Sequence, residues 1–300
     1  MRPLPNSSSA DIGSALLRLA FVVHTCEMGD DVTLDADVLA YYEQGREQAR
    51  LDTACRLEFL RTNELLARFM PAAPAAVLDV GGGAGAYAVP LAAAGYDVSL
   101  IDPVPLHVEQ AQRAGVRAAA VGDARSLRFD DDSFDAVLLF GPLYHLPERS
   151  ERLRALREAA RVVRPSGVVM AAVIPRFAST LDGLHAGFLL DPRFEEIVEA
   201  DLMTGQHRNV GRDPGWFTTA YFHHPAEIGA EFADAGCTVT NILAVEGPTS
   251  GMDRLDRWLD DDERRASLLR AISRVESEPS ILGCSSHLFV VARLQGELVG

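Results

Sequence analysis

A glycine-rich turn follows a short apolar run in the first third of the chain, and its spacing suits contact with a nucleotide-like ligand. The segment is Asp79-Val80-Gly81-Gly82-Gly83-Ala84-Gly85. Because Gly81, Gly83 and Gly85 have no Cβ, their backbone N–H groups can approach a ligand beside a helix N-terminus. Gly81, Gly83 and Ala86 also satisfy a relaxed dinucleotide fingerprint. The turn alone therefore indicates a cofactor site without choosing the cofactor, and a purely structural turn stays open.

Carboxylates follow the next predicted strands. Asp102 ends the second strand, where it could accept the ribose hydroxyl protons of NAD or of another adenosine-type cofactor, although an Asp in this place is also a common turn former. Gly122-Asp123-Ala124 follows the third strand, and Asp132-Ser133-Phe134-Asp135-Ala136-Val137 leads into the fourth. An NAD site gives no reason for Asp123-Ala124, so this segment favours another adenosine-type cofactor over NAD.

With these segments in order, residues 76 to 174 resemble the class I S-adenosylmethionine-dependent methyltransferases, of the bacterial small-molecule type. The resemblance implies an α/β fold: a Rossmann-like, doubly wound sheet of seven strands, the last of them antiparallel. It also implies S-adenosylmethionine as cofactor and methyl transfer to a small-molecule acceptor, with S-adenosylhomocysteine as by-product. An NAD-dependent oxidoreductase and a non-catalytic S-adenosylmethionine-binding protein remain as alternatives.

The resemblance assigns roles to individual residues. The three glycines would pack against the methionine and ribose, and Asp79 would help to hold the ammonium group. Asp102 would bind the ribose hydroxyls, and Asp123 the adenine amino group. The backbone N–H of Ala124 would serve a ring nitrogen, while Val104 would cover one adenine face. The predicted cofactor-binding residues are Tyr42, Asp79, Gly81, Gly83, Gly85, Asp102, Pro103, Val104, Gly122, Asp123, Ala124, Phe140 and Gly141.

The segment Phe140-Gly141-Pro142-Leu143-Tyr144-His145-Leu146 corresponds to the family's active-site loop. Methyl transfer is an in-line displacement that depends on positioning, and it needs a general base only if the acceptor must lose a proton. His145 is the first candidate for that base, although a histidine here can also simply pack beside the cofactor. Tyr144 and His223 complete the predicted catalytic set.

Two regions outside the resemblance could cover the site. Tyr42, Arg46 or Arg50 could reach the methionine carboxylate from an N-terminal helix, or could belong to an ordinary amphipathic helix. Residues 176–224 carry aromatic and imidazole groups without clean periodicity, and these could roof an acceptor pocket or pin a lid onto the core. No metal site is predicted, because the adjacent imidazoles His223 and His224 face opposite sides of an extended chain.

The elements that must position these residues alternate between strand and helix, as in a doubly wound parallel sheet. The predicted domains are a helical cap (1–70) and a methyltransferase domain (71–300) with insertions at about 176–224 and 247–283. Helices are expected at 86–94, 106–114, 148–163 and 225–235. Strands are expected at 76–80, 97–101, 116–121, 134–140, 168–174, 238–245 and 287–293.

Composition excludes several classes of function. The 300 residues include 28 basic and 43 acidic side chains, for a net charge of −15, without a basic run that would bind nucleic acid. The four cysteines lie far apart, so neither zinc nor a disulfide framework is expected. The short apolar run at 15–23 is interrupted by Arg18 and is neither a signal peptide nor a membrane span. We therefore expect a cytoplasmic protein whose partner is a small-molecule substrate, with a homodimer left open.

Overall fold

The computed structural model describes residues 38, 42, 55–213, 215–249 and 251–296. The chain divides into two compact units, Met1–Asp31 and Val32–Gly300, and all described residues belong to the second. Most of the predicted N-terminal cap, with Arg46 and Arg50, lies outside the described residues. Val38 and Tyr42 have helical backbone, and a helix is described near the end of the cap. In the described ranges, no helix is long and apolar enough to cross a membrane.

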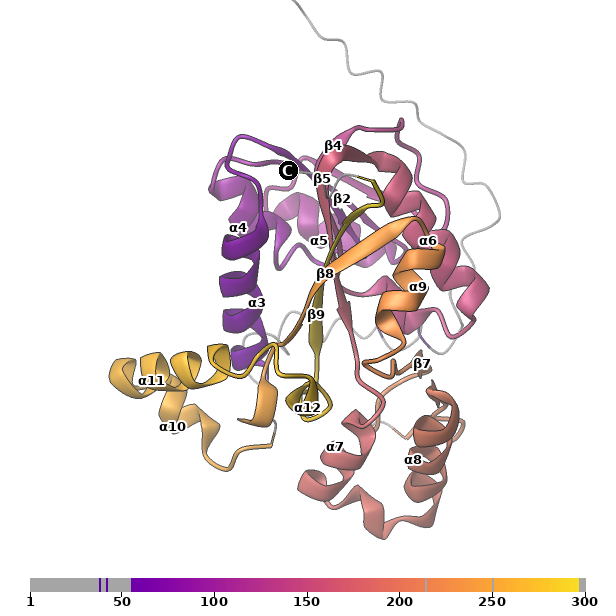
Figure 1. The fold of residues 1–300 in the computed structure, drawn as a ribbon, viewed down its shortest axis with the longest axis vertical. Helices are drawn as coiled ribbons and strands as arrows, with labels where there is room; N and C mark the ends of the chain where they lie inside the picture. The colour runs from indigo at the N-terminus through magenta and orange to yellow at the C-terminus, as the bar shows by residue number, and fades with distance from the viewer. Residues whose placement is uncertain (1–37, 39–41, 43–54, 214, 250, 297–300) are drawn as a thin grey trace, which may run out of the picture. The chain divides into compact units, whose positions relative to one another are not determined.

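A single seven-stranded sheet organises the second unit, in the order β3-β2-β1-β4-β5-β9-β8 (Figure 1). Neighbours pair in parallel except at β9, which is antiparallel to both β5 and β8, so the predicted fold is confirmed. The order reverses between β1 and β4, and ligands bind at such a switch point in open α/β sheets. The strands are β1 (Ala76–Val80), β2 (Asp97–Asp102), β3 (Ala118–Val121), β4 (Phe134–Leu139), β5 (Val163–Val173), β8 (Cys237–Ala244) and β9 (Leu288–Leu294).

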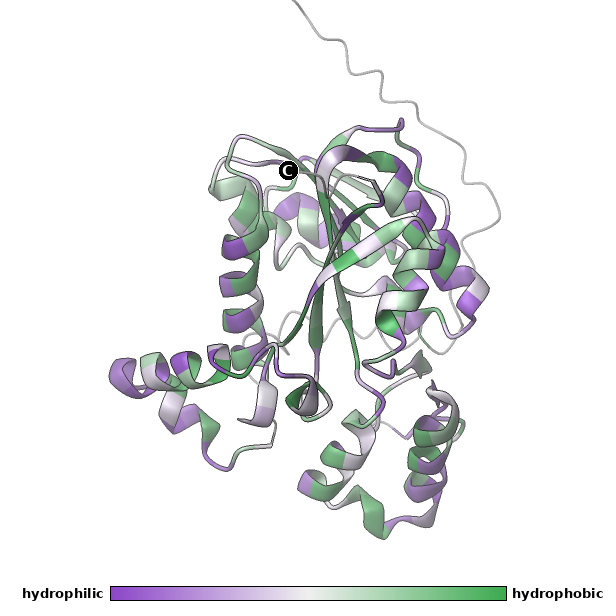
Figure 2. Ribbon diagram, in the orientation of Figure 1, coloured by the Kyte–Doolittle hydropathy of each residue, from purple (hydrophilic) through white to green (hydrophobic). Residues whose placement is uncertain are grey.

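The central strands are apolar, as Figure 2 shows by their green colour, and their side chains are buried on both faces of the sheet. In β4, Val137 and Leu139 pack into the core on one face, and Ala136 and Leu138 pack into the core on the other. This alternation follows from the two-residue period of a strand. Helices cover both faces. One face carries α3 (Arg56–Phe69), α4 (Ala88–Ala93) and α5 (Pro105–Arg113), and the other carries α6 (Arg149–Val162), α9 (Ile228–Asp234) and α12 (Pro279–Leu282).

One prediction about local structure was wrong. β5 begins at Val163, five residues before the predicted start at 168, because Val163 already pairs with Phe134 across a register shift. Residues 176–224, an insertion in which the sequence shows no clean periodicity, form two helices and a small antiparallel sheet. These elements are α7 (Ala178–Ala186), α8 (Pro192–Thr204), β6 (Gln206–His207) and β7 (Ala220–Tyr221).

The insertion that contains α7 and α8 has its own small core. Phe194 and Val198 of α8 pack against Trp216, away from the main sheet. The Asp191 side chain caps α8 by accepting from the Arg193 N–H. The insertion leaves the sheet at the carboxyl end of β5 (Figure 1). A second insertion, with α10 (Leu255–Leu259) and α11 (Asp262–Ser273), follows the carboxyl end of β8 and packs on α3.

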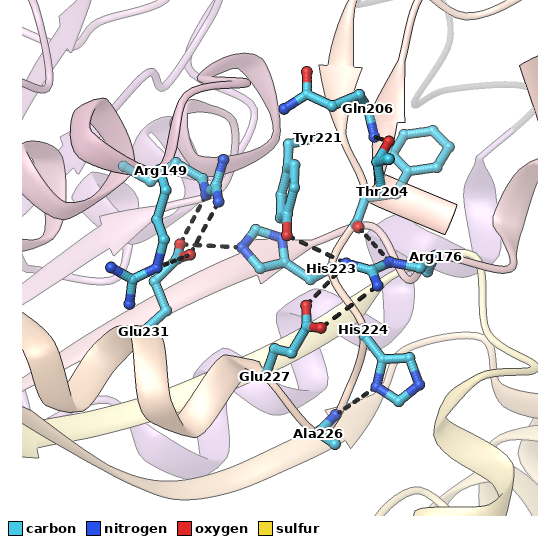
Figure 3. A network of polar contacts seen from close by, with 12 residues as sticks. Arg149, Arg176, Thr204, Gln206, Tyr221, His223, His224, Ala226, Glu227 and Glu231 are labelled. Atoms are coloured by element: carbon cyan, nitrogen blue, oxygen red, sulfur yellow. Dashed lines mark hydrogen bonds and ion pairs between the residues drawn. The ribbon is translucent and has the colours of Figure 1, made fainter. Parts of the chain in front are cut away.

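A buried ion pair connects α6 to α9 next to the first insertion. Arg152 donates through Nε and Nη2 to the Glu231 carboxylate at 2.8 and 3.0 Å, and its guanidinium lies 3.5 Å from the Tyr221 ring centroid. Nε2 of His223 lies 3.3 Å from the same carboxylate (Figure 3). Burial disfavours ionisation of Glu231, but hydrogen bonds from His223 and Arg152 outweigh it and lower its pKa to about 2. Burial also lowers the pKa of His223, so we take the ring as neutral and Arg152 as the cation that keeps Glu231 ionised.

We expect Glu231→Gln to lower the free energy of unfolding by about 3 kcal/mol, because it leaves the Arg152 guanidinium buried without an anion. Urea unfolding at pH 7 measures the loss. Glu227→Gln is the matched control: Glu227 accepts from Arg176 at 2.8 Å, an interaction drawn in Figure 3, but its side chain is more than half exposed. That variant should lose less than about 1 kcal/mol. Equal losses in the two variants would show that the buried ion pair contributes no more to the free energy of unfolding than the exposed pair.

Candidate active site

A cavity lies at the edge of the sheet where β1, β2, β3 and β4 end. Of the residues predicted for the cofactor or for catalysis, all but two line this cavity. Gly85 instead faces the helix layer, where an added Cβ would lie 3.3 Å from Val89. His223 is buried beside Glu231. The predicted residues that line the cavity are Tyr42, Asp79, Gly81, Gly83, Asp102, Pro103, Val104, Gly122, Asp123, Ala124, Phe140, Gly141, Tyr144 and His145.

The glycine turn is held against β2 and leaves open space at one position. The N–H groups of Gly81 and Gly82 both donate to the Ile101 carbonyl, at 2.7 and 3.3 Å. Gly83 has φ +55°, and a Cβ added there would meet nothing within 4 Å. At Gly82 a Cβ would lie 2.6 Å from the Asp79 carboxylate. Side chains are therefore excluded at Gly82 by the protein itself, and at Gly83 only by backbone strain and by whatever fills the cavity.

Asp79 is fully buried and lines the cavity. Neither of its carboxylate oxygens has a hydrogen-bond partner among the described residues. Burial, followed by the nearby Asp102 carboxylate, raises the pKa of Asp79 to about 7. Buried carboxylates are normally paired, because desolvation without a partner is costly. This side chain is thus suited to a cationic group of a ligand.

Asp102 is held by three N–H donors. Its Oδ2 accepts from the Gly83 N–H at 2.9 Å, and its Oδ1 accepts from the Val104 N–H at 2.9 Å and from Nδ1 of His107 at 3.0 Å. Since the carboxylate only accepts, His107 must carry its proton on Nδ1, which leaves a lone pair on Nε2. That Nε2 is buried without a partner among the described residues, and the ring lines the cavity. Sequence analysis missed His107, although it lies within the helix that directly follows Asp102.

Asp123 is already engaged by a neighbouring arginine. Arg125 donates to both of its carboxylate oxygens, with Nη2 2.6 Å from Oδ2, and also contacts Glu151. The hydrogen bond that Arg125 donates to Asp123 is the largest cause that raises the pKa of Arg125. An adenine amino group at Asp123 would therefore share the carboxylate with Arg125, a lining residue that sequence analysis also missed.

His145 lies between rings from distant parts of the chain. Its Nε2 is 2.7 Å from the Tyr42 hydroxyl, and the two rings meet edge to face at 5.1 Å. On another side, Phe217 of the first insertion stacks on His145 at 5.8 Å. The Tyr144 hydroxyl donates to the Phe140 carbonyl at 2.7 Å. Tyr42 and Phe217 thus both reach the loop after β4.

The cavity lining also includes polar groups that sequence analysis did not single out. Glu58 lies on α3, and His287 comes directly before β9. Behind His287 lies Glu246, just past the end of β8, with its Oε1 2.8 Å from Nδ1 of His287. One ligand atom from each of these three residues lies within 4.8 Å of the other two. These three residues lie far apart in the sequence, so no sequence motif indicates the cluster.

Comparisons with known proteins match part of this chain to methyltransferases. Residues 78–171 match the family model for a methyltransferase domain. The ubiquinone biosynthesis O-methyltransferase of Xanthomonas oryzae is 33% identical over 176 residues, which cover 57% of this chain and 65% of the relative. An uncharacterized methyltransferase of Mycobacterium tuberculosis is 37% identical over 99 residues, which cover 33% of this chain and 39% of the relative. The match therefore spans less than two thirds of these relatives.

Solved structures show the same fold at lower identity. A S-adenosylmethionine-dependent methyltransferase from Thermotoga maritima has a TM-score of 0.54 at 17% identity, covering 85% of this chain and 99% of that one. Another from Methanosarcina mazei has a TM-score of 0.52 at 21% identity, covering 77% and 97%. Strand order, glycine turn and family match agree with one another. The fold is that of the class I S-adenosylmethionine-dependent methyltransferases, and residues 78–171 match the model for a methyltransferase domain.

Proposed function

We propose that this chain transfers a methyl group from S-adenosylmethionine to a hydroxyl group of a small aromatic molecule and releases S-adenosylhomocysteine. The observation that carries the donor site is Asp79, a fully buried carboxylate that lines the cavity and lacks a partner among the described residues. The donor's ammonium group is the cation that would satisfy it. Bound there, the donor supplies a methyl group on a sulfonium sulfur, which is open to in-line displacement.

Asp102 and His107 together would hold the ribose. A carboxylate offers about four lone-pair positions, and three are used by the N–H groups of Gly83, Val104 and His107. One position therefore remains for one ribose hydroxyl. The second hydroxyl can donate to Nε2 of His107, whose lone pair is fixed by the hydrogen bond from Nδ1 to Asp102. Asp123 and the Ala124 N–H remain the proposed adenine contacts, with Val104 against the ring.

The residues around the loop after β4 would close the cavity over the reacting groups. We assign His145 to this closure, because its Nε2 already bonds the Tyr42 hydroxyl and its ring stacks on Phe217. Tyr144 supports the same loop through the Phe140 carbonyl. His223 does not line the cavity and takes no part in the proposal.

An aromatic hydroxyl is favoured as acceptor for two reasons. The cavity is lined by the rings of Tyr42, Tyr87, Phe140, Tyr144 and Phe289, which suit a planar molecule. The Xanthomonas relative is named for an O-methylation in ubiquinone biosynthesis. The net charge of −15 makes nucleic acid an unfavourable substrate.

Calorimetry and a transfer assay test this function. We expect S-adenosylmethionine and S-adenosylhomocysteine to bind with Kd values roughly in the micromolar range, and NADH not to bind. Incubation with methyl-labelled donor and a panel of catechols, monophenols and primary amines should label a phenol. Donor binding without transfer to any compound in the panel would favour a non-catalytic binding protein. NADH binding in place of S-adenosylmethionine would overturn the donor site itself.

A further inference from the structure

The strand order brings Glu246 and His287 to the cavity from segments far apart in sequence. β9 is antiparallel to its neighbours, so its beginning lies beside the carboxyl ends of β5 and β8 (Figure 1). Ala244 pairs with Leu288, and the Val245 N–H donates to the His287 carbonyl at 3.0 Å. Glu246 and His287 are therefore set next to each other by the register of the sheet.

The Glu246 carboxylate is held firmly. Its Oε1 accepts from Nδ1 of His287 at 2.8 Å. Its Oε2 accepts from the Ser285 hydroxyl at 2.8 Å and from the His287 N–H at 2.9 Å. The Ser285 oxygen in turn accepts from the N–H groups of Glu246 and Gly247. Burial opposes ionisation of Glu246, but the adjacent His287 and these hydrogen bonds lower its pKa, so it is a carboxylate at neutral pH.

A fixed carboxylate determines the state of the imidazole. Since Glu246 only accepts, Nδ1 of His287 carries the proton and Nε2 carries the lone pair. The carboxylate also stabilises the imidazolium that forms when Nε2 takes up a proton, as in the carboxylate–histidine pairs of hydrolases. His287 lines the cavity, whereas Glu246 lies behind it. This arrangement is that of a general base and its positioning residue.

The pair lies on the acceptor side of the cavity. The proposed donor contacts follow β1, β2 and β3, while β9 lies beyond β4 and β5. Three strand spacings separate β9 from β1, roughly 14 Å at 4.8 Å each. A second carboxylate, Glu58, lines the cavity with its Oε2 3.9 Å from Nδ1 of His287. Two carboxylates at this wall disfavour the donor's own carboxylate and favour a proton-bearing acceptor.

We propose that His287 is the general base that accepts the proton of the acceptor's hydroxyl group, with Glu246 as its positioning residue. The proposal rests on the methyl-transfer function above. The O–H proton goes to Nε2, and the electron pair of that bond stays on the oxygen, which bonds to the methyl carbon. The electron pair of the methyl–sulfur bond stays on the sulfur, which becomes neutral. The proton later leaves Nε2 for solvent.

The test compares full-length wild type with His287→Asn and Glu246→Gln, and with His224→Asn as a control outside the cavity. The acceptor probes are catechol and the more acidic 4-nitrocatechol. Affinity for S-adenosylhomocysteine should stay within about twofold in all variants. For catechol we expect His287→Asn to lower kcat roughly 10²- to 10⁴-fold, with a smaller change in KM. The loss of kcat should be smaller at alkaline pH and with 4-nitrocatechol, because in both cases the acceptor's hydroxyl group loses its proton without a base.

Glu246→Gln should move the acidic limb of the kcat–pH profile to lower pH, and His287→Asn should abolish that limb. A merely structural role for the pair would leave the limb in place. Nitrogen NMR of the imidazole rings gives a readout that needs no turnover: wild-type His287 should carry its proton on Nδ1, and its signals should respond to catechol. A proton on Nε2, or no response to catechol, would overturn the proposal.

Two further outcomes separate the possible failures. Wild type that binds neither S-adenosylhomocysteine nor S-adenosylmethionine would remove the proposed function itself. If His287→Asn keeps the full turnover of the wild type, His287 is not the general base, and the proposed methyl transfer still stands. Glu58, Glu246 and His287 also have the spacing of metal ligands, so activity should persist in EDTA. Loss in EDTA with recovery on adding Mg²⁺, Mn²⁺ or Zn²⁺ would identify a metal site instead and overturn the base.

Discussion

Asp79→Asn should weaken S-adenosylmethionine binding and, in the same protein without ligand, remove a pH-dependent loss of stability. The buried carboxylate would lose its charge-assisted bond to the donor's ammonium group, which is worth about 1.5–3 kcal/mol. We therefore expect the Kd at pH 8 to rise roughly 10- to 150-fold. Calorimetric titration with S-adenosylmethionine and S-adenosylhomocysteine measures this change.

The stability effect follows from the titration of the same group. Burial and the Asp102 charge raise the pKa of Asp79 from 3.8 to about 7. Between these values the folded protein holds a proton that the unfolded chain has released. The stability contributed by that proton is present at low pH and is lost as the pH rises toward 7. The shift of about three units corresponds to about 4 kcal/mol.

The measurement is the unfolding free energy of variant minus wild type, from urea melts without ligand. This difference should rise by about 4 kcal/mol between pH 4 and pH 8. Asp97→Asn is the matched control, since Asp97 begins β2 at an exposed position. A difference that stays flat across this range would show that Asp79 ionises normally. Unchanged affinity for the donor would show that the ammonium group binds elsewhere.

Gly83→Ala should weaken donor binding far more than it weakens the fold. Gly83 has φ +55° and Gly95 has φ +93°, and an added Cβ meets nothing within 4 Å at either position. The left-handed backbone costs an alanine about 1–2 kcal/mol in both. Only Gly83 lines the cavity, so only its methyl group would occupy space needed by the ligand.

We expect Gly83→Ala and Gly95→Ala to lose similar unfolding free energy in urea melts. The Kd for S-adenosylmethionine should rise roughly 10- to 200-fold in Gly83→Ala and stay near the wild-type value in Gly95→Ala. Equal affinities in the two variants would place the methionine and ribose away from the glycine turn. The pair of variants thus separates backbone strain from occupation of the site.

Much of the sheet was predictable because its signals are local. The apolar run at 76–80, the glycine turn and the acid at the end of β2 are each recognised from a short stretch of sequence. The structure confirms the strands that they imply. The first insertion was predicted, but its helix α8 was missed despite a local signal: Asp191-Pro192 begins α8, and Gly205 ends it with φ +75°. Its apolar residues pack on one another rather than on the sheet, so no single long stripe marks the helix.

The sequence by itself determined the fold class, the sheet and which residues follow β1 to β4, since each of these depends on neighbours along the chain. Only the tertiary structure decided which further side chains share the cavity or support it. His107 depends on the orientation of α5 toward Asp102. Glu246 and His287 meet across 41 positions through the register of β8 and β9. A hydrogen bond of that kind depends on strand pairing between distant segments, and no local pattern of residue types records it.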